Sequence, residues 1–172
     1  MLDEVERLEQ LAHNLLVLAR SRSGTLVGGD TPVDLETVVD RAARAVGRRA
    51  ESRGVHVRCS GNAVVNGDES ALERAVLNVV DNAVRYATGE VTVTVAEQAA
   101  MVEVTVTDDG PGFDEALLPR AFDRYTRDPG RGGGMGLGLA ITAAIVGAHG
   151  GTVAAANRPE RGAEVRLSLP AA

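Results

Sequence analysis

Apolar residues recur along the chain with two spacings, and each spacing predicts a type of element. Intervals of three and four residues predict helices that begin after Asp34, after Asp68 and near Gly136. Aspartate is a common N-cap because its side chain accepts a hydrogen bond from a free backbone N–H of the first helical turn. The second helix is expected to end at about Ala87, and the third is expected to end before Gly150.

Strict alternation of apolar and polar residues predicts the strands. These strands are expected at residues 55–59, 91–95, 102–106, 152–156 and 164–169, with the second and third forming a hairpin. Helices and strands in this order predict an α+β domain, in which one mixed sheet is covered by helices on one face. The expected architecture is therefore a two-layer α/β sandwich.

The first residues carry a separate apolar stripe. Residues 1–22 read as an amphipathic helix whose apolar positions are Val5, Leu8, Ala12, Leu15 and Ala19. Such a stripe needs a partner helix, which a second chain could supply. Residues 23–33 read as a linker, and residues 34–172 as the main domain. No run of about 18 apolar residues is present, and the start lacks a signal-peptide pattern, so a cytoplasmic fragment is expected.

The composition narrows the chemistry. All 18 basic residues are arginines, which excludes a Walker-A loop, a protein-kinase fold and a pyridoxal site, because each needs a lysine. Aromatic residues make up 2% of the chain, so the core must consist of Val, Leu, Ala and Ile. The net charge of −6 and the scarcity of aromatics argue against a nucleic-acid partner. Cys59 is the single cysteine, so there is no internal disulfide.

Glycines are concentrated between residues 110 and 138. They belong to two segments, one of which could contact phosphates and the other a flat ring. The run Gly132–Leu139 leads directly into a predicted helix, so its backbone N–H groups and the helix N-terminus could cradle phosphates. The alternative is a flexible surface loop. Asp108–Gly112 follows a strand and places a carboxylate where it could accept a hydrogen bond from an exocyclic amine. The alternative here is an ordinary turn.

The helix after Asp68 adds a polar stripe. Asn78, Asn82 and Arg85 lie within about 60° of each other at the helical angle per residue. Amide oxygens can complete a magnesium shell whose charge is met by phosphates, and an arginine can donate to those phosphates. The alternative is a solvated polar face.

Together and in order, these segments resemble the catalytic ATP-binding domain of bacterial sensor histidine kinases, in the GHKL ATPase superfamily. Asn78–Tyr86 resembles the N box, Asp108–Phe113 the G1 box, Ala121–Tyr125 the F box and Gly134–Leu139 the G2 box. The similarity covers roughly residues 32–170. It implies the Bergerat type of α/β sandwich.

The resemblance also implies a set of roles. Asn82, helped by Asn78, would hold Mg²⁺ between the phosphates of ATP, and Asp108 would bind the adenine amino group. Residues 113–133 would form a lid. Further nucleotide contacts are implied for Arg85, Tyr86, Gly110, Gly112, Phe122, Arg124, Arg127, Gly134, Met135, Gly136, Leu137 and Gly138. Among these, Tyr86 would lie near the adenine and Arg124 or Arg127 would reach the γ-phosphate. Arg85 departs from the lysine common at that position, and the two side chains are not interchangeable.

The expected reaction needs a second domain. Residues 6–20 resemble the end of the second helix of a dimerisation and phosphoacceptor domain, but none of the three histidines has the context of a phosphoacceptor. The resemblance therefore implies that Mg-ATP donates its γ-phosphoryl group to a histidine outside this sequence, for relay to an aspartate of a response regulator. The fragment is expected to be monomeric, and the parent a homodimeric membrane sensor with this domain in the cytoplasm.

Three alternatives remain at this point. A related superfamily member could phosphorylate serine, as an anti-sigma-factor kinase does. A second possibility is a nucleotide-sensing module that binds without chemistry. The third is a structural adaptor that uses only its N-terminal helix.

Overall fold

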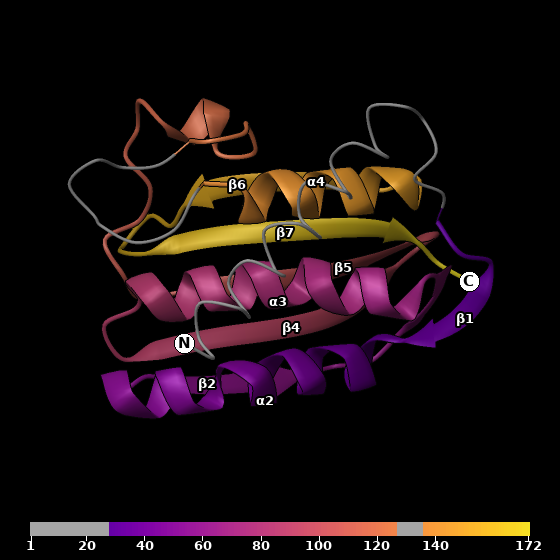
Figure 1. Cartoon of the computed structure of the whole chain (residues 1–172), viewed down its shortest axis with the longest axis horizontal. Helices are drawn as coiled ribbons and strands as arrows, with labels where there is room; N and C mark the ends of the chain where they lie inside the picture. Colours follow the sequence, from indigo (N-terminus) through magenta and orange to yellow (C-terminus); the bar gives the residue numbers. More distant parts are fainter. Residues whose placement is uncertain (1–27, 127–135) are drawn as a thin grey trace, which may run out of the picture.

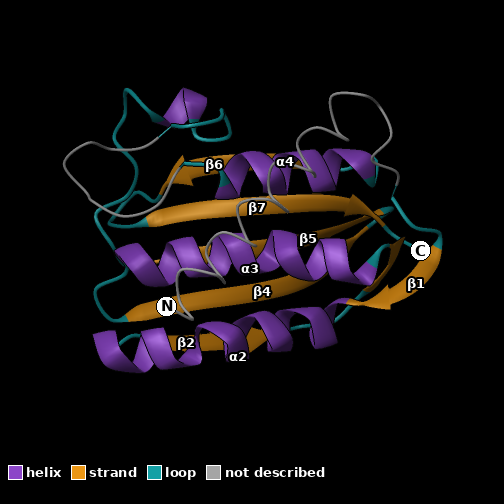
Figure 2. Ribbon diagram, viewed as in Figure 1, coloured by secondary structure: helices purple, strands orange, loops and turns teal. Residues whose placement is uncertain are grey.

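The computed structural model describes residues 28–126 and 136–172, and they form two layers. Three helices lie in front of a five-stranded sheet in the views of Figures 1 and 2. In chain order the elements are β1 (Thr31–Asp34), α2 (Leu35–Arg53), β2 (His56–Ser60), β3 (Val64–Gly67), α3 (Glu69–Tyr86), β4 (Glu90–Gln98), β5 (Met101–Asp108), the 3₁₀ turn η1 (Leu118–Arg120), α4 (Gly138–Ala148), β6 (Thr152–Asn157) and β7 (Ala163–Pro170). The predicted α+β sandwich is confirmed.

The large sheet has the order β2-β4-β5-β7-β6 and is mixed. The β2–β4 pair is parallel, and the other three neighbouring pairs are antiparallel. The predicted hairpin is confirmed as β4 and β5, in which Val93 pairs with Val106. The central strand is β5, and Asp108 is the residue at its carboxyl end.

Two aspartates begin the long helices as the sequence predicts. Asp34 accepts a hydrogen bond from the N–H of Glu36, and Asp68 accepts one from the N–H of Ala71. The start of α3 is also tied to the end of α4, because the N–H of Asp68 donates to Nε2 of His149 at 3.0 Å. The His149 side chain therefore connects the ends of α3 and α4.

A second, two-stranded sheet joins β1 to β3 and was not predicted. Thr31 pairs with Gly67 and Asp34 with Val64. Each strand buries a single large apolar side chain, Val33 and Val65, so neither has enough residues to display alternation. Residues 31–33, which the sequence analysis assigns to the linker, belong to β1. The predicted helix of residues 1–22 lies outside the described residues.

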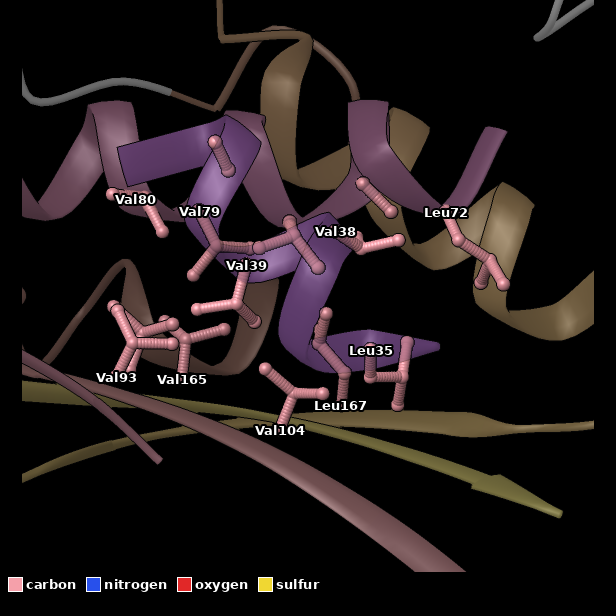
Figure 3. Packing of buried hydrophobic residues seen from close by; sticks show 14 of the residues in the cluster. Leu35, Val38, Val39, Leu72, Val79, Val80, Val93, Val104, Val165 and Leu167 are labelled. Carbon is pink, nitrogen blue, oxygen red and sulfur yellow. The ribbon is translucent and has the colours of Figure 1, made fainter. Parts of the chain in front are cut away.

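The core lies between the helices and the sheet and is aliphatic. Figure 3 shows Leu35, Val38 and Val39 of α2 and Val79 and Val80 of α3 above Val93, Val104, Val165 and Leu167 of the strands. Within the described residues no aromatic side chain is fully buried, as the low aromatic content predicts. Branched aliphatic side chains lose little rotamer freedom on packing, and this favours a dense and well-defined interior.

No helix in residues 28–126 or 136–172 is long and apolar enough to cross a membrane.

Candidate functional site: a cleft beside helix α3

A cleft opens between the end of α3, the turn after β5 and the start of α4. The empty space in this cleft, including its open mouth, is about 630 Å³. Eleven residues line it: Asn82, Tyr86, Asp108, Gly112, Phe113, Asp114, Leu117, Ala121, Thr126, Leu139 and Ala163. Most of this lining is apolar, and Asn82 and Asp108 supply directed polar groups.

Asp108 is the buried polar group of the cleft, with 6% of its surface exposed. Its Oδ1 accepts hydrogen bonds from the N–H of Gly110 at 2.8 Å and of Ala163 at 3.4 Å. No hydrogen bond to its Oδ2 occurs within the described residues. Burial raises the pKa of this carboxyl, and the two backbone hydrogen bonds and Arg158 oppose the shift. The Oδ2 atom is thus left to accept a hydrogen bond from a ligand.

The two glycines after Asp108 let the backbone approach its neighbours closely. A Cβ on Gly110 would lie 2.4 Å from the carbonyl oxygen of Tyr86, which no side chain could tolerate. Gly110 is therefore buried behind the cleft, whereas Gly112 lines it. Both positions fit a turn that brings a flat ligand against main chain.

The next residue, Asp109, points away from the cleft. Its Oδ1 accepts hydrogen bonds from the N–H of Thr88 at 2.8 Å and of Gly89 at 3.0 Å. Burial would raise the pKa of this carboxyl, but hydrogen bonds from the backbone of residues 88–90 and from the Thr88 hydroxyl outweigh it and lower the pKa to about 2. Asp109 holds the connection between α3 and β4.

The polar stripe of α3 divides between the cleft and its surroundings. Asn82 and Tyr86, one turn apart, line the cleft. Asn78 does not line it, because its Nδ2 donates to the carbonyl oxygen of Gly138 at 3.2 Å, at the start of α4. Arg85 also lies outside the lining, and it pairs with Asp81 at 3.1 Å.

The glycine segment before α4 is described only in part. Gly134, Met135 and Arg127 lie outside the described residues. Gly136 accepts a hydrogen bond from the N–H of Tyr125 at 2.8 Å, which joins the segment to the end of the F-box sequence. Leu137 is buried and Gly138 begins α4, so this helix starts beside the cleft.

The two F-box residues named from the sequence lie outside the cleft lining. Phe122 is partly buried and packs against the core, and Arg124 is exposed. The same stretch nevertheless contributes Leu117, Ala121 and Thr126 to the lining. Ala121 is the first residue of the F box, whereas Leu117 and Thr126 belong to no motif that the sequence shows. Phe113 carried a signal, because it is one of four aromatic residues and is the last residue of the G1 box.

Metal-binding side chains do not cluster in this part of the protein. Within residues 28–126 and 136–172 no group of three or more His, Cys, Asp and Glu side chains could hold a metal ion. The ligands on offer at the cleft are the amide of Asn82 and, one turn away, that of Asn78. Neutral amide oxygens fit a hard cation such as Mg²⁺ whose charge is balanced by phosphates.

A known protein family matches the part of the chain that lines the cleft. The family model described as "Histidine kinase-, DNA gyrase B-, and HSP90-like ATPase" matches residues 67–172. The chain belongs to this ATPase family. The matched range runs from the start of α3 to the C-terminus, and so includes every residue that lines the cleft.

Similar proteins carry the sensor histidine kinase name. A "Probable sensor histidine kinase HK" of Mycobacterium tuberculosis is 40% identical over 98% of this chain and 45% of its own length. The "Sensor histidine kinase component HK1" of the same species is 44% identical over 70% of this chain and 73% of its own length. The chain thus spans less than half the length of the first of these relatives.

Solved structures agree. A "Mycobacterial sensor histidine kinase MprB" structure superposes with a TM-score of 0.74 at 34% identity, covering 83% of this chain and 97% of that one. Full-length ShkA in complex with AMPPNP superposes with a TM-score of 0.83 at 29% identity, covering 99% of this chain and 37% of that one. The histidine kinase ATPase domain is thus similar in sequence and in fold.

Proposed function

We propose that this chain is the ATP-binding catalytic domain of a two-component sensor histidine kinase. It binds Mg-ATP and presents the γ-phosphoryl group to a histidine of a dimerisation domain, from which the group passes to an aspartate of a response regulator. The observation that carries the proposal is Asp108, a buried carboxylate that lines the cleft and has one oxygen committed to backbone N–H groups.

The base end of the cleft fits adenine. The Oδ2 of Asp108 accepts a hydrogen bond from the exocyclic amine, which adenine has and hypoxanthine lacks. Apolar side chains such as Leu117 and Leu139 cover the flat faces of the ring, and Tyr86 lies on the same wall. A site built to hydrogen-bond an amine discriminates strongly against an analogue without it, because the acceptor is then left unpaired.

The other end of the cleft fits the phosphates. The start of α4 offers backbone N–H groups and the positive end of a helix dipole. Asn82, with Asn78 beside it, would hold Mg²⁺, which supplies charge neutralisation when bound. Gly134, Gly136 and Gly138 line the phosphates in this proposal, and residues 113–133 close over them.

Transfer then depends on position more than on covalent chemistry by this domain. Phosphoryl transfer proceeds through a loose transition state, so the protein contributes alignment and charge stabilisation. This chain binds the base, orients the triphosphate and excludes water. The attacking imidazole comes from the dimerisation domain.

The wider assignments follow from the same proposal. Residues 1–22 are the end of a dimerisation helix, residues 23–30 a linker and residues 31–172 the catalytic domain, which includes β1. The fragment is monomeric, whereas the parent is a homodimer in the bacterial membrane with this domain on the cytoplasmic side. The sensor names of the relatives support this arrangement.

Calorimetry tests nucleotide binding directly. The chain is titrated with a non-hydrolysable ATP analogue with and without Mg²⁺, and Asp108→Ala is titrated in parallel. We expect binding by the wild type and a loss of more than tenfold in the variant. Absence of binding by the wild type would refute the proposal and favour an adaptor.

Labelled ATP tests the acceptor. The chain is incubated with a separate histidine-bearing dimerisation domain, and the product is examined for its stability to acid and base. Acid-labile phosphohistidine is expected. Acid-stable phosphoserine on a protein partner would instead identify a serine kinase of the same superfamily.

A further inference from the structure

The hairpin between β6 and β7 holds the turn that follows Asp108. Asn157, the last residue of β6, makes two hydrogen bonds to the backbone of Phe113. Its Oδ1 accepts from the Phe113 N–H at 2.7 Å, and its Nδ2 donates to the Phe113 carbonyl oxygen at 2.9 Å. A carboxamide supplies one acceptor and one donor side by side, so the pair fixes both the position and the orientation of the backbone at Phe113.

Two arginines of the same hairpin extend the contact along the turn. Nη1 of Arg158 donates to the carbonyl oxygen of Asp108 at 3.3 Å, and Nε of Arg161 donates to that of Gly110 at 3.3 Å. Both contacts are partly buried. Cationic donors to backbone carbonyls are stronger than neutral ones.

The hairpin backbone also packs directly on Asp108. A Cβ on Gly162 would lie 1.8 Å from the carbonyl oxygen of Asp108, so only glycine fits there. The adjacent N–H, that of Ala163, is one of the two donors to the Asp108 carboxylate. Side chains and main chain of the hairpin therefore reach the same six-residue turn.

This turn needs external support. Gly110, Pro111 and Gly112 form its centre, and glycine loses more conformational freedom on ordering than any other residue. Gly112 and Phe113 line the base end of the cleft, and Asp108 supplies the acceptor there. If this turn were flexible in the free protein, ordering it on ligand binding would reduce the affinity.

We propose that Asn157 is a positioning residue for base recognition, and that the β6–β7 hairpin holds the Asp108–Phe113 turn in the conformation that receives the nucleobase. Arg158 and Arg161 assist it through the carbonyls of the turn. The inference rests on the proposed function, since it concerns how the same cleft selects its base.

The test compares ADP with inosine diphosphate, which lacks the exocyclic amine. Asn157→Ala is expected to weaken ADP binding about tenfold and inosine diphosphate binding less than about twofold, so the preference for ADP narrows. Asn157→Asp keeps the acceptor but loses the donor, and it is expected to fall between the wild type and Asn157→Ala. Both are measured by calorimetry or by competition.

Asn62→Ala is the matched control. Asn62 is exposed in the loop between β2 and β3, and its side chain makes no hydrogen bond within the described residues. A merely structural role predicts that Asn157→Ala lowers the melting temperature and leaves both the ADP affinity of the folded protein and the base preference unchanged. That result would overturn the inference.

Failure of the proposed function and failure of the inference about Asn157 give different results. If the wild type binds no adenine nucleotide, the proposed function fails and the inference falls with it. If the wild type binds ADP and the Asn157 variants bind it with unchanged preference, only the inference fails. Where Asn157→Ala does not fold, the same comparison with Asn157→Asp decides.

Discussion

Arg85 donates to the carboxylate of Asp81, one turn earlier in α3, at 3.1 Å. The other oxygen of Asp81 is bound by Arg49 of α2. Both oxygens of Asp81 are thus paired with guanidinium groups, so this carboxylate is not free to act as a base. The arrangement also anchors the arginine that stands where related kinases commonly have lysine.

We expect a cation at position 85 to contribute to phosphate binding. Arg85→Ala should weaken binding of the ATP analogue more than binding of ADP, because the side chain is expected to reach the phosphates. Arg85→Lys should retain most of the affinity, since the charge stays while the planar fork is lost. Calorimetry with both nucleotides measures the difference. Equal affinities for all three proteins would remove Arg85 from the binding site.

Asp108→Asn should separate stability from binding. The amide oxygen can still accept from Gly110 and Ala163, but Nδ2 would present a donor to the adenine amine, which is also a donor. We expect ADP affinity to fall more than tenfold. Burial raises the pKa of Asp108, so the ionised form is disfavoured in the folded state.

The pH dependence follows from that direction. A raised folded-state pKa lowers the free energy of unfolding as pH rises from the ordinary aspartate value through the raised value. The asparagine variant lacks this slope, so near neutral pH it should be at least as stable as the wild type. Denaturant unfolding at several pH values gives the comparison. A variant that is both unstable and unable to bind would show that the carboxylate supports the fold.

The large elements could be predicted because their patterns are long. Helix α3 has eighteen residues and β4 nine, so each repeats its spacing several times and carries a recognisable N-cap or alternation. The four-residue strands β1 and β3 show no such repeat. Their pairing depends on contacts between distant parts of the chain.

The candidate site was predictable where a motif specifies backbone geometry. Asp108 and Gly112 belong to the G1 box at the end of β5, and both line the cleft. Leu117 and Leu139 could not be singled out, because a leucine on a pocket wall looks like any core leucine. Asn157 lies far from the motifs in the sequence, so only the fold shows that it reaches Phe113.

Asp109 should change the free energy of unfolding with pH in the opposite direction to Asp108, because its pKa is lowered and that of Asp108 is raised. Its folded-state pKa is lowered to about 2, so its contribution to the free energy of unfolding is present above about pH 4 and is lost as pH falls toward 2. Asp109→Asn should therefore be less stable than the wild type near neutral pH, by about 1 kcal/mol for the weakened hydrogen bonds. The gap should close as pH approaches 2. Urea unfolding of both proteins between pH 2 and 6 measures it, and a gap that is constant with pH would contradict the assignment.

His149 joins the ends of two helices, and its removal should lower the free energy of unfolding. Its Nε2 accepts from the N–H of Asp68 at 3.0 Å, and its Nδ1 lies 2.7 Å from the carbonyl oxygen of Ile145, which fits a neutral ring protonated at Nδ1. His149→Phe keeps a ring of similar shape and leaves the Asp68 N–H without its acceptor. We expect a loss of about 0.5–1.5 kcal/mol in the free energy of unfolding, because water can replace part of this exposed hydrogen bond. His56→Phe, on the exposed strand β2, is the control and should change stability by less than about 0.5 kcal/mol. If both variants unfold at the same denaturant concentration, the α3–α4 connection does not depend on the imidazole.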